Sequence, residues 1–469
     1  MHLKRIASMA LSLSVIAVMS AQAAALDMSE YVRMNDGVSY SMTAPTYWIN
    51  KYNSSAVFEG TNEHILHTAD EIEQINKYNA QAECVGDYEM SLYDIEDKID
   101  GGFVRAIFDS ISCPDPSSSY LNGKPTTQSY WDKLIDNADM DKVPDTVQVR
   151  YGYSTARSSL RIYPSYDFIG EDKDDRFFDV MVMGEYMPFR PLVVLHESKD
   201  KNWYYVMFEG YSGWVNKKYV ALCESREDWV DRMEPEDFLV VTGREIRLQD
   251  DVRSPSLSGQ LIPMGTVLPL VKKKSAPKMI NDRETTACYI VKLPVRKADG
   301  YISDKYSLIS IREDVHVGYL DYTAEAVVRQ AFKRLGDRYG WAGDNYSNDC
   351  SGIAGEIYRC FGISLPRVSG QIADLKNVHT VDLSGMSNEE KLEALSEAPI
   401  GSLLWFRGHI MIYIGMNDGD PYCISATGTY INGKSDTIDT NSVIITDMAK
   451  SYRASGASWL EELGKIVMV

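Results

Sequence analysis

The sequence predicts a multidomain protein in which a C-terminal α+β domain follows two β-rich segments and a mainly helical N-terminal segment. Three observations predict this fold class. The chain has 469 residues, 44% of them hydrophobic, which suffices for about three domains of roughly 100 to 200 residues each. Alternating apolar strands separated by polar turns fill the middle of the chain. Near the C-terminus, two amphipathic helical patterns precede a strand pattern.

The first residues have the three parts of a secretory signal peptide. Lys4 and Arg5 precede an apolar run at 6–19, and an Ala-Gln-Ala cleavage motif ends at Ala23. We therefore expect a signal peptide over residues 1–23 and an exported protein, either periplasmic or extracellular. No later stretch has the ~18 to 20 apolar residues of a membrane helix, so no membrane span is expected.

The segment that follows, residues 24–145, predicts a mainly helical domain. Thr68 and Glu71 form a capping box, in which each side chain caps the backbone of the other residue, and Ile72 and Ile75 follow at helical spacing. The helices are expected to have their apolar residues on one face, as in other amphipathic helices.

Two small β-barrels are expected next, over residues 146–225 and 236–312. The stretch at 198–222, SKDKNWYYVMFEGYSGWVNKKYVAL, resembles the end of a bacterial SH3-like barrel, where a Gly-Trp-Val strand closes the fold. The runs at 261–271 and 287–303 indicate a second unit with the same order of strands.

The last segment, residues 323–469, places a thiol and a base on two anchored elements. Cys350 precedes an apolar helical stripe and is expected in the first turn of a helix, where backbone N–H groups favour a thiolate. His409 begins the alternating run HIMIYIG and is expected at the end of a strand. This pair indicates a cysteine hydrolase.

The same segment resembles the NlpC/p60 family of cell-wall peptidases. The resemblance rests on RYGWAGDNYSNDCSG at 338–352, LPRVSGQ at 365–371 and GSLLWFRGHIMIYIG at 401–415, with Ala342 where the family has glycine. It implies a papain-like α+β catalytic domain preceded by SH3-like barrels. It also implies a peptidase that cuts peptidoglycan stem peptides between D-glutamate, at its γ-carboxyl, and the following diamino acid.

The resemblance further implies roles for individual residues. Cys350 would attack the γ-carbonyl to form an acyl-enzyme, with His409 as general base. The family places a second polar residue on the next strand, and the match is Ser425 in PYCISATG, which is either an orienting group or only a small strand residue. Asp349 is expected to hold a free N-terminal amine, and Arg367 with Ser369 to meet the glutamate α-carboxylate. The candidate substrate-binding residues are Tyr339, Asp349, Ser351, Arg367 and Ser369.

Charge and cysteine content restrict the function further. The net charge of −19 becomes −21 without Lys4 and Arg5, which argues against a nucleic-acid partner. The seven cysteines are scattered, so their spacing predicts neither a metal site nor a disulfide framework. No metal or cofactor is implied, and the oligomeric state is left open.

Family members with SH3-like barrels before the catalytic domain select stems with a free N-terminal L-alanine, so we expect a processor of liberated wall peptides. The alternative is a non-catalytic cell-wall peptide binding protein whose active site is impaired at Ser425. A thiol enzyme that transfers acyl groups on lipids or proteins is a third interpretation, which predicts an apolar groove instead.

Overall fold

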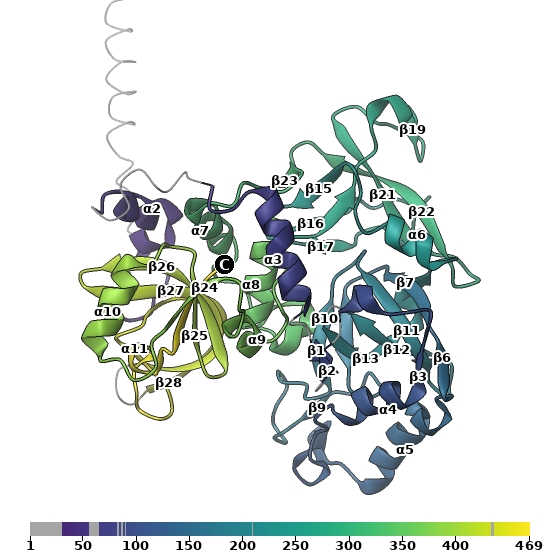
Figure 1. Ribbon diagram of the computed structural model, residues 1–469, viewed down its shortest axis with the longest axis horizontal. Coiled ribbons are helices and arrows are strands. Elements are labelled where there is room, and N and C mark those ends of the chain that lie inside the picture. The colour runs from purple at the N-terminus through teal and green to yellow at the C-terminus, as the bar shows by residue number, and fades with distance from the viewer. Residues whose placement is uncertain are drawn as a thin grey trace, which may run out of the picture.

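The computed structural model describes most of the chain after the expected signal peptide, and residues 1–23 lie outside the described part. Figure 1 shows the C-terminal region, called the catalytic region below because the candidate residues Cys350 and His409 lie in it, on one side and two strand-rich regions on the other. No helix among the described residues is long and apolar enough to cross a membrane. The described residues are 31–55, 65–81, 84–85, 88–89, 91–208, 210–432 and 436–469.

The first strand-rich region is a curved sheet of seven antiparallel strands that closes around buried aromatic side chains such as Tyr205 and Trp214. Its strand order is β10-β8-β13-β12-β11-β7-β14. The strands are β7 (Arg150–Ser154), β8 (Ser158–Arg161), β10 (Val182–Tyr186), β11 (Pro191–Glu197), β12 (Trp203–Phe208), β13 (Tyr211–Asn216) and β14 (Val220–Leu222).

The second strand-rich region, called the second barrel below after the sequence prediction, pairs its strands in several small sheets. It has its own core, which includes Leu239, Ile262 and Val291. Helix α6 (Arg226–Asp231) connects it to the first barrel. Its longest pairing is the β21–β22 hairpin. The strands are β15 (Phe238–Val241), β16 (Glu245–Arg247), β17 (Leu261–Pro263), β18 (Val267–Pro269), β19 (Met279–Ile280), β20 (Arg283–Glu284), β21 (Cys288–Arg296), β22 (Ile302–Ser310) and β23 (Val315–Val317).

The helices expected over residues 24–145 are present, but they pack into two different cores. Trp48 of α2 is buried in the core of the catalytic region, and α3 is tied to the same region by Asn79, whose side chain donates to Ser364 O at 2.7 Å. Val104 of α4 and Trp131 of α5 belong instead to the core of the first barrel. The bounds are α2 (Pro45–Asn53), α3 (Ala69–Gln81), α4 (Gly101–Asp109) and α5 (Gln128–Ala138).

This division has a physical reason. Each helix is short and has one apolar face, and the helix is stabilised most when that face packs on a core that already exists. The segment therefore wraps the molecule from the catalytic region to the first barrel. In Figure 1, α2 lies at the catalytic region, α3 at the junction of the regions, and α4 and α5 beneath the first barrel.

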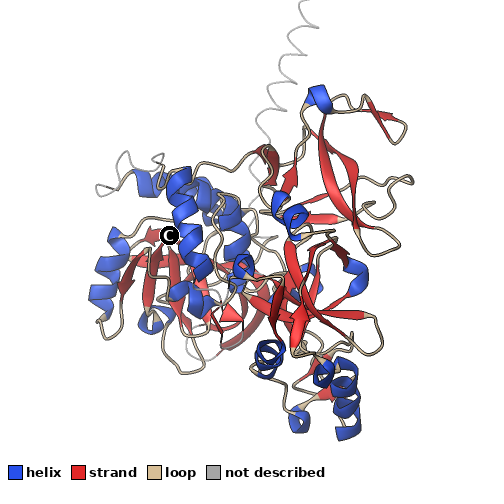
Figure 2. Cartoon of the chain, turned by 45° about the vertical axis from the view of Figure 1, so that its right-hand side comes forward, coloured by secondary structure: helices blue, strands red, loops and turns tan. Residues whose placement is uncertain are grey.

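The catalytic region is a mixed helix and sheet domain, which Figure 2 shows beside the strand-rich barrels. Its sheet has the order β24-β30-β25-β26-β27-β28. The strands are β24 (His379–Asp382), β25 (Leu403–Phe406), β26 (His409–Asn417), β27 (Asp420–Asn432), β28 (Asp436–Asp447) and β30 (Lys465–Met468). The helices are α7 (Ala324–Phe332), α8 (Cys350–Arg359), α9 (Ser369–Ala373), α10 (Asn388–Glu397) and α11 (Trp459–Glu462).

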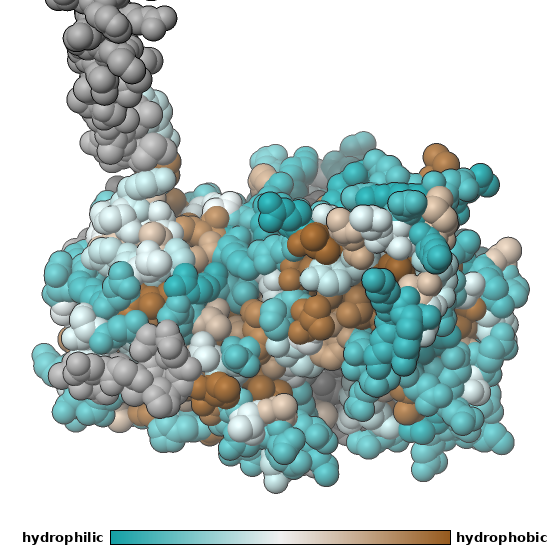
Figure 3. Space-filling model, turned by 90° about the horizontal axis from the view of Figure 1, so that it is seen from above, coloured by the Kyte–Doolittle hydropathy of each residue, from teal (hydrophilic) through white to brown (hydrophobic). Residues whose placement is uncertain are grey.

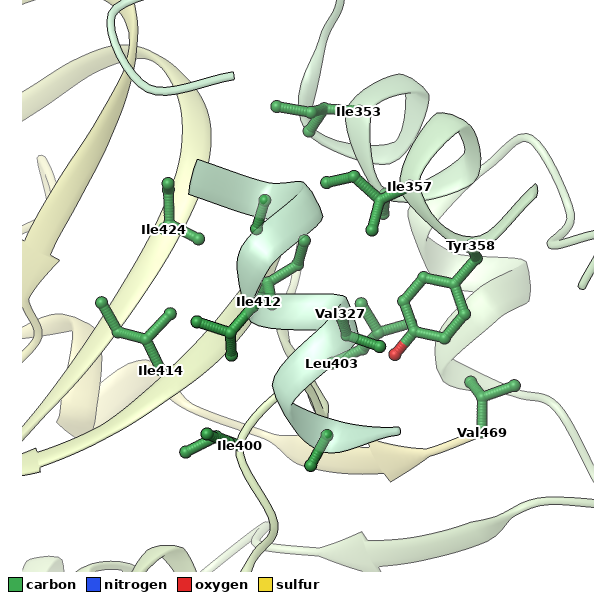
Figure 4. Packing of buried hydrophobic residues seen from close by; sticks show 14 of the residues in the cluster. Val327, Ile353, Ile357, Tyr358, Ile400, Leu403, Ile412, Ile414, Ile424 and Val469 are labelled. Carbon is green, nitrogen blue, oxygen red and sulfur yellow. The ribbon is translucent and has the colours of Figure 1, made fainter. Parts of the chain in front are cut away.

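Strand β26 alternates between two cores, as its sequence predicts. Ile412 and Ile414 pack under α7 and α8 in the cluster of Figure 4, where Ile353 and Ile357 point from α8 toward the sheet. Met411 and Tyr413 belong to the cluster on the opposite face, beside α10 and α11. Because both faces of β26 are buried, its first residue is held rigidly.

The three regions also meet around a cavity of about 950 Å³, lined by residues of α3, both barrels and the linker at 319–322. Figure 3 views the molecule from above, and most of this face is hydrophilic, with hydrophobic residues gathered near its middle. The hydrophilic surface is consistent with the strongly negative net charge of the chain.

Candidate active site

The candidate nucleophile is the first residue of α8. Asp349 is the N-cap of this helix, and its Oδ1 accepts a hydrogen bond of 2.8 Å from the Gly352 N–H. The apolar stripe behind Cys350 packs on the sheet, and Tyr358 donates to Gly401 O at 2.8 Å. The helix start is therefore fixed by a cap at one end and by core packing along its length.

The candidate base is the first residue of β26. His409 Nε2 lies 3.1 Å from Ser425 Oγ on the neighbouring strand, and Ser425 Oγ lies 3.0 Å from Thr427 Oγ1. The imidazole ring is also 5.4 Å from the ring of Phe406 and 5.3 Å from that of Trp459. Ser425 therefore lies within hydrogen-bonding distance of one nitrogen of the candidate base.

Cys350 and His409 line the same cleft, which has a volume of about 1010 Å³. Tyr339 and Ser369 line it as well. The loop before α8 carries a strained residue, because Ala342, which stands where the family has glycine, has a φ of 51°. This left-handed conformation costs a non-glycine residue about 1–2 kcal/mol.

The electrostatics of the pair differ from the sequence-based expectation of a thiolate. Burial, and then the Asp349 carboxylate, raise the pKa of the Cys350 thiol to about 11, although the Ile410 N–H and Arg367 oppose the shift. Burial and the charge of Arg453 lower the pKa of His409 to about 4, against the opposing effect of Asp349. Both shifts favour the neutral forms, a thiol and an uncharged imidazole, because the amides of one helix end do not offset burial.

Two predicted binding residues are paired with each other. Arg367 donates from Nη2 to Asp349 Oδ2 at 2.7 Å and from Nη1 to Ser351 Oγ at 2.8 Å. A carboxylate has about four lone-pair sites, and Asp349 uses three of them for Arg367, the Gly352 N–H and the Ser351 hydroxyl, 3.4 Å away. Asp349 is thus mainly a helix cap and an anchor for Arg367, with room for one more donor.

The structure adds cleft residues that sequence reasoning missed. Phe178, Met183 and Tyr211 come from the first barrel and form one wall of the cleft. Arg453 and Glu462 line the cleft as well, and the charge of Arg453 acts on His409. No local pattern marks these residues, because the two groups reach the cleft from separate parts of the chain through tertiary packing.

Among the described residues, no group of three or more His, Cys, Asp or Glu side chains is placed to hold a metal ion. The chemistry available in the cleft is that of a thiol, a neutral imidazole, a buried arginine–aspartate pair and several hydroxyl groups. Such a set suits nucleophilic attack on an acyl carbon.

Comparisons with known proteins agree with the fold and with the order of the regions. Residues 336–455 match the model of the NlpC/P60 family, and residues 164–216 match an SH3 domain model of the SH3b1 type. No curated protein matches the chain. The resemblance stated from the sequence is therefore confirmed at the level of these two domains.

Two solved structures are among those similar to this chain. A novel NlpC/P60 endopeptidase from Photobacterium damselae subsp. piscicida is 17% identical with a TM-score of 0.68, covering 93% of this chain and 98% of that chain. An NlpC/P60 family protein from Bacillus cereus is also 17% identical, with a TM-score of 0.46 and coverage of 67% and 98%. The first likeness extends to the N-terminal helices and both barrels. The chain thus carries an NlpC/P60 family domain preceded by a bacterial SH3 domain.

Proposed function

We propose that this protein is an exported cysteine peptidase that cleaves the γ-D-glutamyl–diamino acid bond of peptidoglycan stem peptides with a free N-terminal L-alanine. NlpC/P60 peptidases are cysteine peptidases, and the matched domain contains both candidate catalytic residues. The observation that carries the proposal is that Cys350 and His409 share a cleft whose far wall is the first barrel.

In the proposed mechanism, the neutral imidazole of His409 takes the thiol proton as Cys350 Sγ attacks the γ-carbonyl carbon. A tetrahedral intermediate forms, and its oxyanion lies near the N–H groups at the start of α8. The imidazolium then protonates the leaving amine, the C–N bond breaks, and a thioester remains. Water, deprotonated by the imidazole, attacks the thioester and releases the D-glutamyl carboxylate and the thiol.

The raised pKa of Cys350 and the lowered pKa of His409 favour this concerted proton transfer over a standing ion pair. A thiol with a high pKa gives a strong nucleophile once it is deprotonated. Charge separation then occurs mainly when substrate is in place, which protects the resting enzyme from oxidation.

The acyl part of the substrate is assigned to the Asp349–Arg367 end of the cleft. Asp349 has room for one further donor, which suits the ammonium of L-alanine. Arg367 uses two of its five N–H donors on Ser351 and Asp349, so it retains capacity for the glutamate α-carboxylate. Ser369, Ser351 and Tyr339 would complete this end of the cleft.

The first barrel supports the preference for a free amino end. Tyr211 lies close to the Asp349–Arg367 pair, and Phe178 and Met183 line the same cleft. A muramic acid attached to L-alanine would have to pass this wall. An acidic, exported protein also suits short liberated peptides better than the anionic wall, because like charges repel.

The experiment is mass spectrometry of the mature protein incubated with L-Ala-γ-D-Glu-diaminopimelate and with the same stem blocked by muramic acid. We expect release of diaminopimelate from the free tripeptide only, and none from Cys350→Ala. Cys113→Ala is the matched control, because Cys113 lies at the first barrel, next to Tyr163 and outside the cleft. Cleavage of both substrates would contradict the preference for a free amino end. Cleavage of neither would contradict the proposal that the protein is a peptidase.

Ser425 separates the peptidase from the alternative of a non-catalytic binding protein. If the 3.1 Å contact to His409 Nε2 orients the imidazole, Ser425→Ala lowers kcat about tenfold with little change in KM. Equal activity of this variant would reduce Ser425 to a small strand residue. Stem-peptide binding without any product in the unmodified protein would support the binding protein instead.

A further inference from the structure

The His409 end of the cleft carries two opposite charges that the proposed mechanism does not use. Arg453 Nη1 lies 3.8 Å from Glu462 Oε2, and both side chains are about one-third exposed, at 35% and 31%. Both residues line the cleft that contains Cys350. They are therefore accessible to a ligand bound there.

The pair is held in position by its surroundings. Arg453 Nη1 donates to Arg407 O at 2.9 Å, and the guanidinium lies 4.6 Å from the ring centre of Phe406. Glu462 Oε1 accepts a hydrogen bond of 3.1 Å from Ser455 Oγ. These contacts use few of the available donors and acceptors, since a guanidinium has five N–H groups and a carboxylate about four lone-pair sites.

The proton chemistry decides which part of the substrate faces this pair. The leaving amine receives its proton from His409, so the diamino acid must lie on the His409 side of the thiol. Phe406 and Trp459 flank the imidazole and belong to the lining of the cleft, although each is only 3% exposed. A side chain of the diamino acid that passes them would extend toward Arg453 and Glu462.

We propose that Arg453 and Glu462 form the subsite for the far end of the leaving diamino acid, with Arg453 binding its carboxylate and Glu462 its ammonium. The proposal rests on the proposed function and deepens it, because it names the diamino acid. Diaminopimelate carries both charges at the far end of its side chain. Lysine carries the ammonium alone and leaves Arg453 without a partner from the substrate.

The two charges also explain why neither Arg453 nor Glu462 alone could select diaminopimelate. An arginine alone would bind any carboxylate, and a glutamate alone would bind either diamino acid. The two together are complementary to a zwitterion, because each charge of the ligand meets its opposite and is kept from its like charge. The arrangement therefore discriminates by the far-end carboxylate.

The test compares kcat/KM for three tripeptides that share L-Ala-γ-D-Glu: one ends in diaminopimelate, one in diaminopimelate with its far-end carboxylate amidated, and one in lysine. The unmodified protein should prefer the first by on the order of tenfold to a hundredfold, the range of a hydrogen bond to a charged group. Arg453→Gln should bring both ratios close to one. Glu462→Gln should lower all three values by similar factors.

Comparing ratios of kcat/KM between substrates removes the indirect effect that Arg453 has on the base, His409. The Arg453 charge lowers the pKa of His409, so Arg453→Gln alters the pH profile, but equally for all three substrates. Arg329→Gln is the matched control, because Arg329 pairs with Glu325 on the outer surface of α7. Its ratios should equal those of the unmodified protein.

Two results would overturn the inference: no preference in the unmodified protein, or equal losses for all three substrates in Arg453→Gln. Calorimetric binding of the same tripeptides to Cys350→Ala separates this failure from that of the proposed function. Selective, Arg453-dependent binding without hydrolysis by the unmodified protein would retain the subsite and reject the peptidase. Hydrolysis of all three tripeptides without selectivity would retain the peptidase and reject the subsite.

Discussion

The two barrels contact helix α8 and the loop before it with different chemistry. The first barrel reaches the loop that leads into Cys350. Arg157, just before β8, donates to Tyr346 O at 3.0 Å and to Ser347 O at 2.7 Å. The position of the nucleophile therefore depends on a side chain almost 200 residues earlier in the chain.

Arg157 also belongs to a buried network of charges. Its Nη2 donates to Glu185 Oε1 at 2.6 Å and lies 4.0 Å from Glu356 of α8, which pairs with Arg334, two residues after α7. Burial raises the pKa of the Glu185 carboxyl to about 7, although the charge of Arg157 opposes this shift. These groups lie away from water and depend on one another.

The second barrel reaches the other end of α8 through apolar and backbone contacts. Met264 is fully buried in the core of the catalytic region. Gly265, with a φ of 77°, lies so close that an added Cβ would stand 2.6 Å from Glu356 O. The charged contacts of this barrel, Arg244 with Asp337 and Asp314 with Lys333, are on the surface, with Arg244 and Asp314 each 54% exposed.

The difference indicates a division of labour. The first barrel fixes the loop before the nucleophile and forms a wall of the cleft, so its contacts can change both substrate choice and catalysis. The second barrel supports the far end of the helix by close packing, so its contacts bear on stability. The following experiments test this division.

The largest expected effect concerns the two cysteines at the two ends of α8. Iodoacetamide should modify Cys350 in the native protein and leave Cys360, which is fully buried with a pKa raised to about 12, unmodified until unfolding. Since the pKa of Cys350 is about 11, its rate should rise about tenfold per pH unit from pH 7 to 9. A rate that is constant over this range would reveal a standing thiolate and contradict the neutral pair.

Arg157→Met should have the largest effect on stability. It leaves Glu185 and Glu356 buried without their shared cation, and breaking a buried ion pair in this way costs about 3–5 kcal/mol. Denaturant unfolding would measure the loss. Arg157→Lys keeps the charge but cannot donate to both carbonyl groups and to Glu185 in the same geometry, so it should be less destabilised and still lose activity. Loss of stability with full activity per folded molecule would contradict the positioning of the loop.

Gly265→Ala should destabilise the protein by about 1–3 kcal/mol, because the new side chain meets a backbone carbonyl and the positive φ disfavours alanine. The division of labour predicts that substrate preference stays unchanged in the molecules that remain folded. Unfolding curves and the ratio of cleavage of free and blocked stems would together check both parts. A changed ratio would show that the second barrel also shapes the cleft.

Local patterns sufficed for the parts of the site that one segment determines. The helix stripe after Cys350 and the alternation after His409 predicted both elements, and adjacent strands brought Ser425 to His409. Contacts across regions had no such signal: the wall that contains Tyr211, and the pairing of Asp349 with Arg367, arise only when separate segments pack. The thiolate expectation failed because burial, which outweighed the helix end, is a tertiary property.

The N-terminal segment shows the same limit of local patterns, in the cores on which its helices pack. Its capping box at Thr68 and Glu71 forms as the sequence predicts, with the Thr68 N–H donating to Glu71 Oε2 at 2.7 Å. Amphipathic spacing shows that a helix has an apolar face, but not which core receives it. Trp48 and Trp131 therefore looked like members of one helical domain and lie in two different cores.

Arg244→Gln should have the smallest effect. The Arg244–Asp337 pair spans 3.0 Å between the second barrel and the catalytic region, as directly as the Arg157 contacts do. Its arginine is exposed, however, so water and salt screen the attraction and the loss should be about 0–1 kcal/mol. Denaturant unfolding at low and at high salt measures this loss of unfolding free energy. The small difference between Arg244→Gln and the unmodified protein should vanish at high salt. Arg157 and Arg244 both join a barrel to the catalytic region. A comparable loss of unfolding free energy in Arg157→Met and Arg244→Gln would therefore mean that burial does not make the first contact stronger than the second.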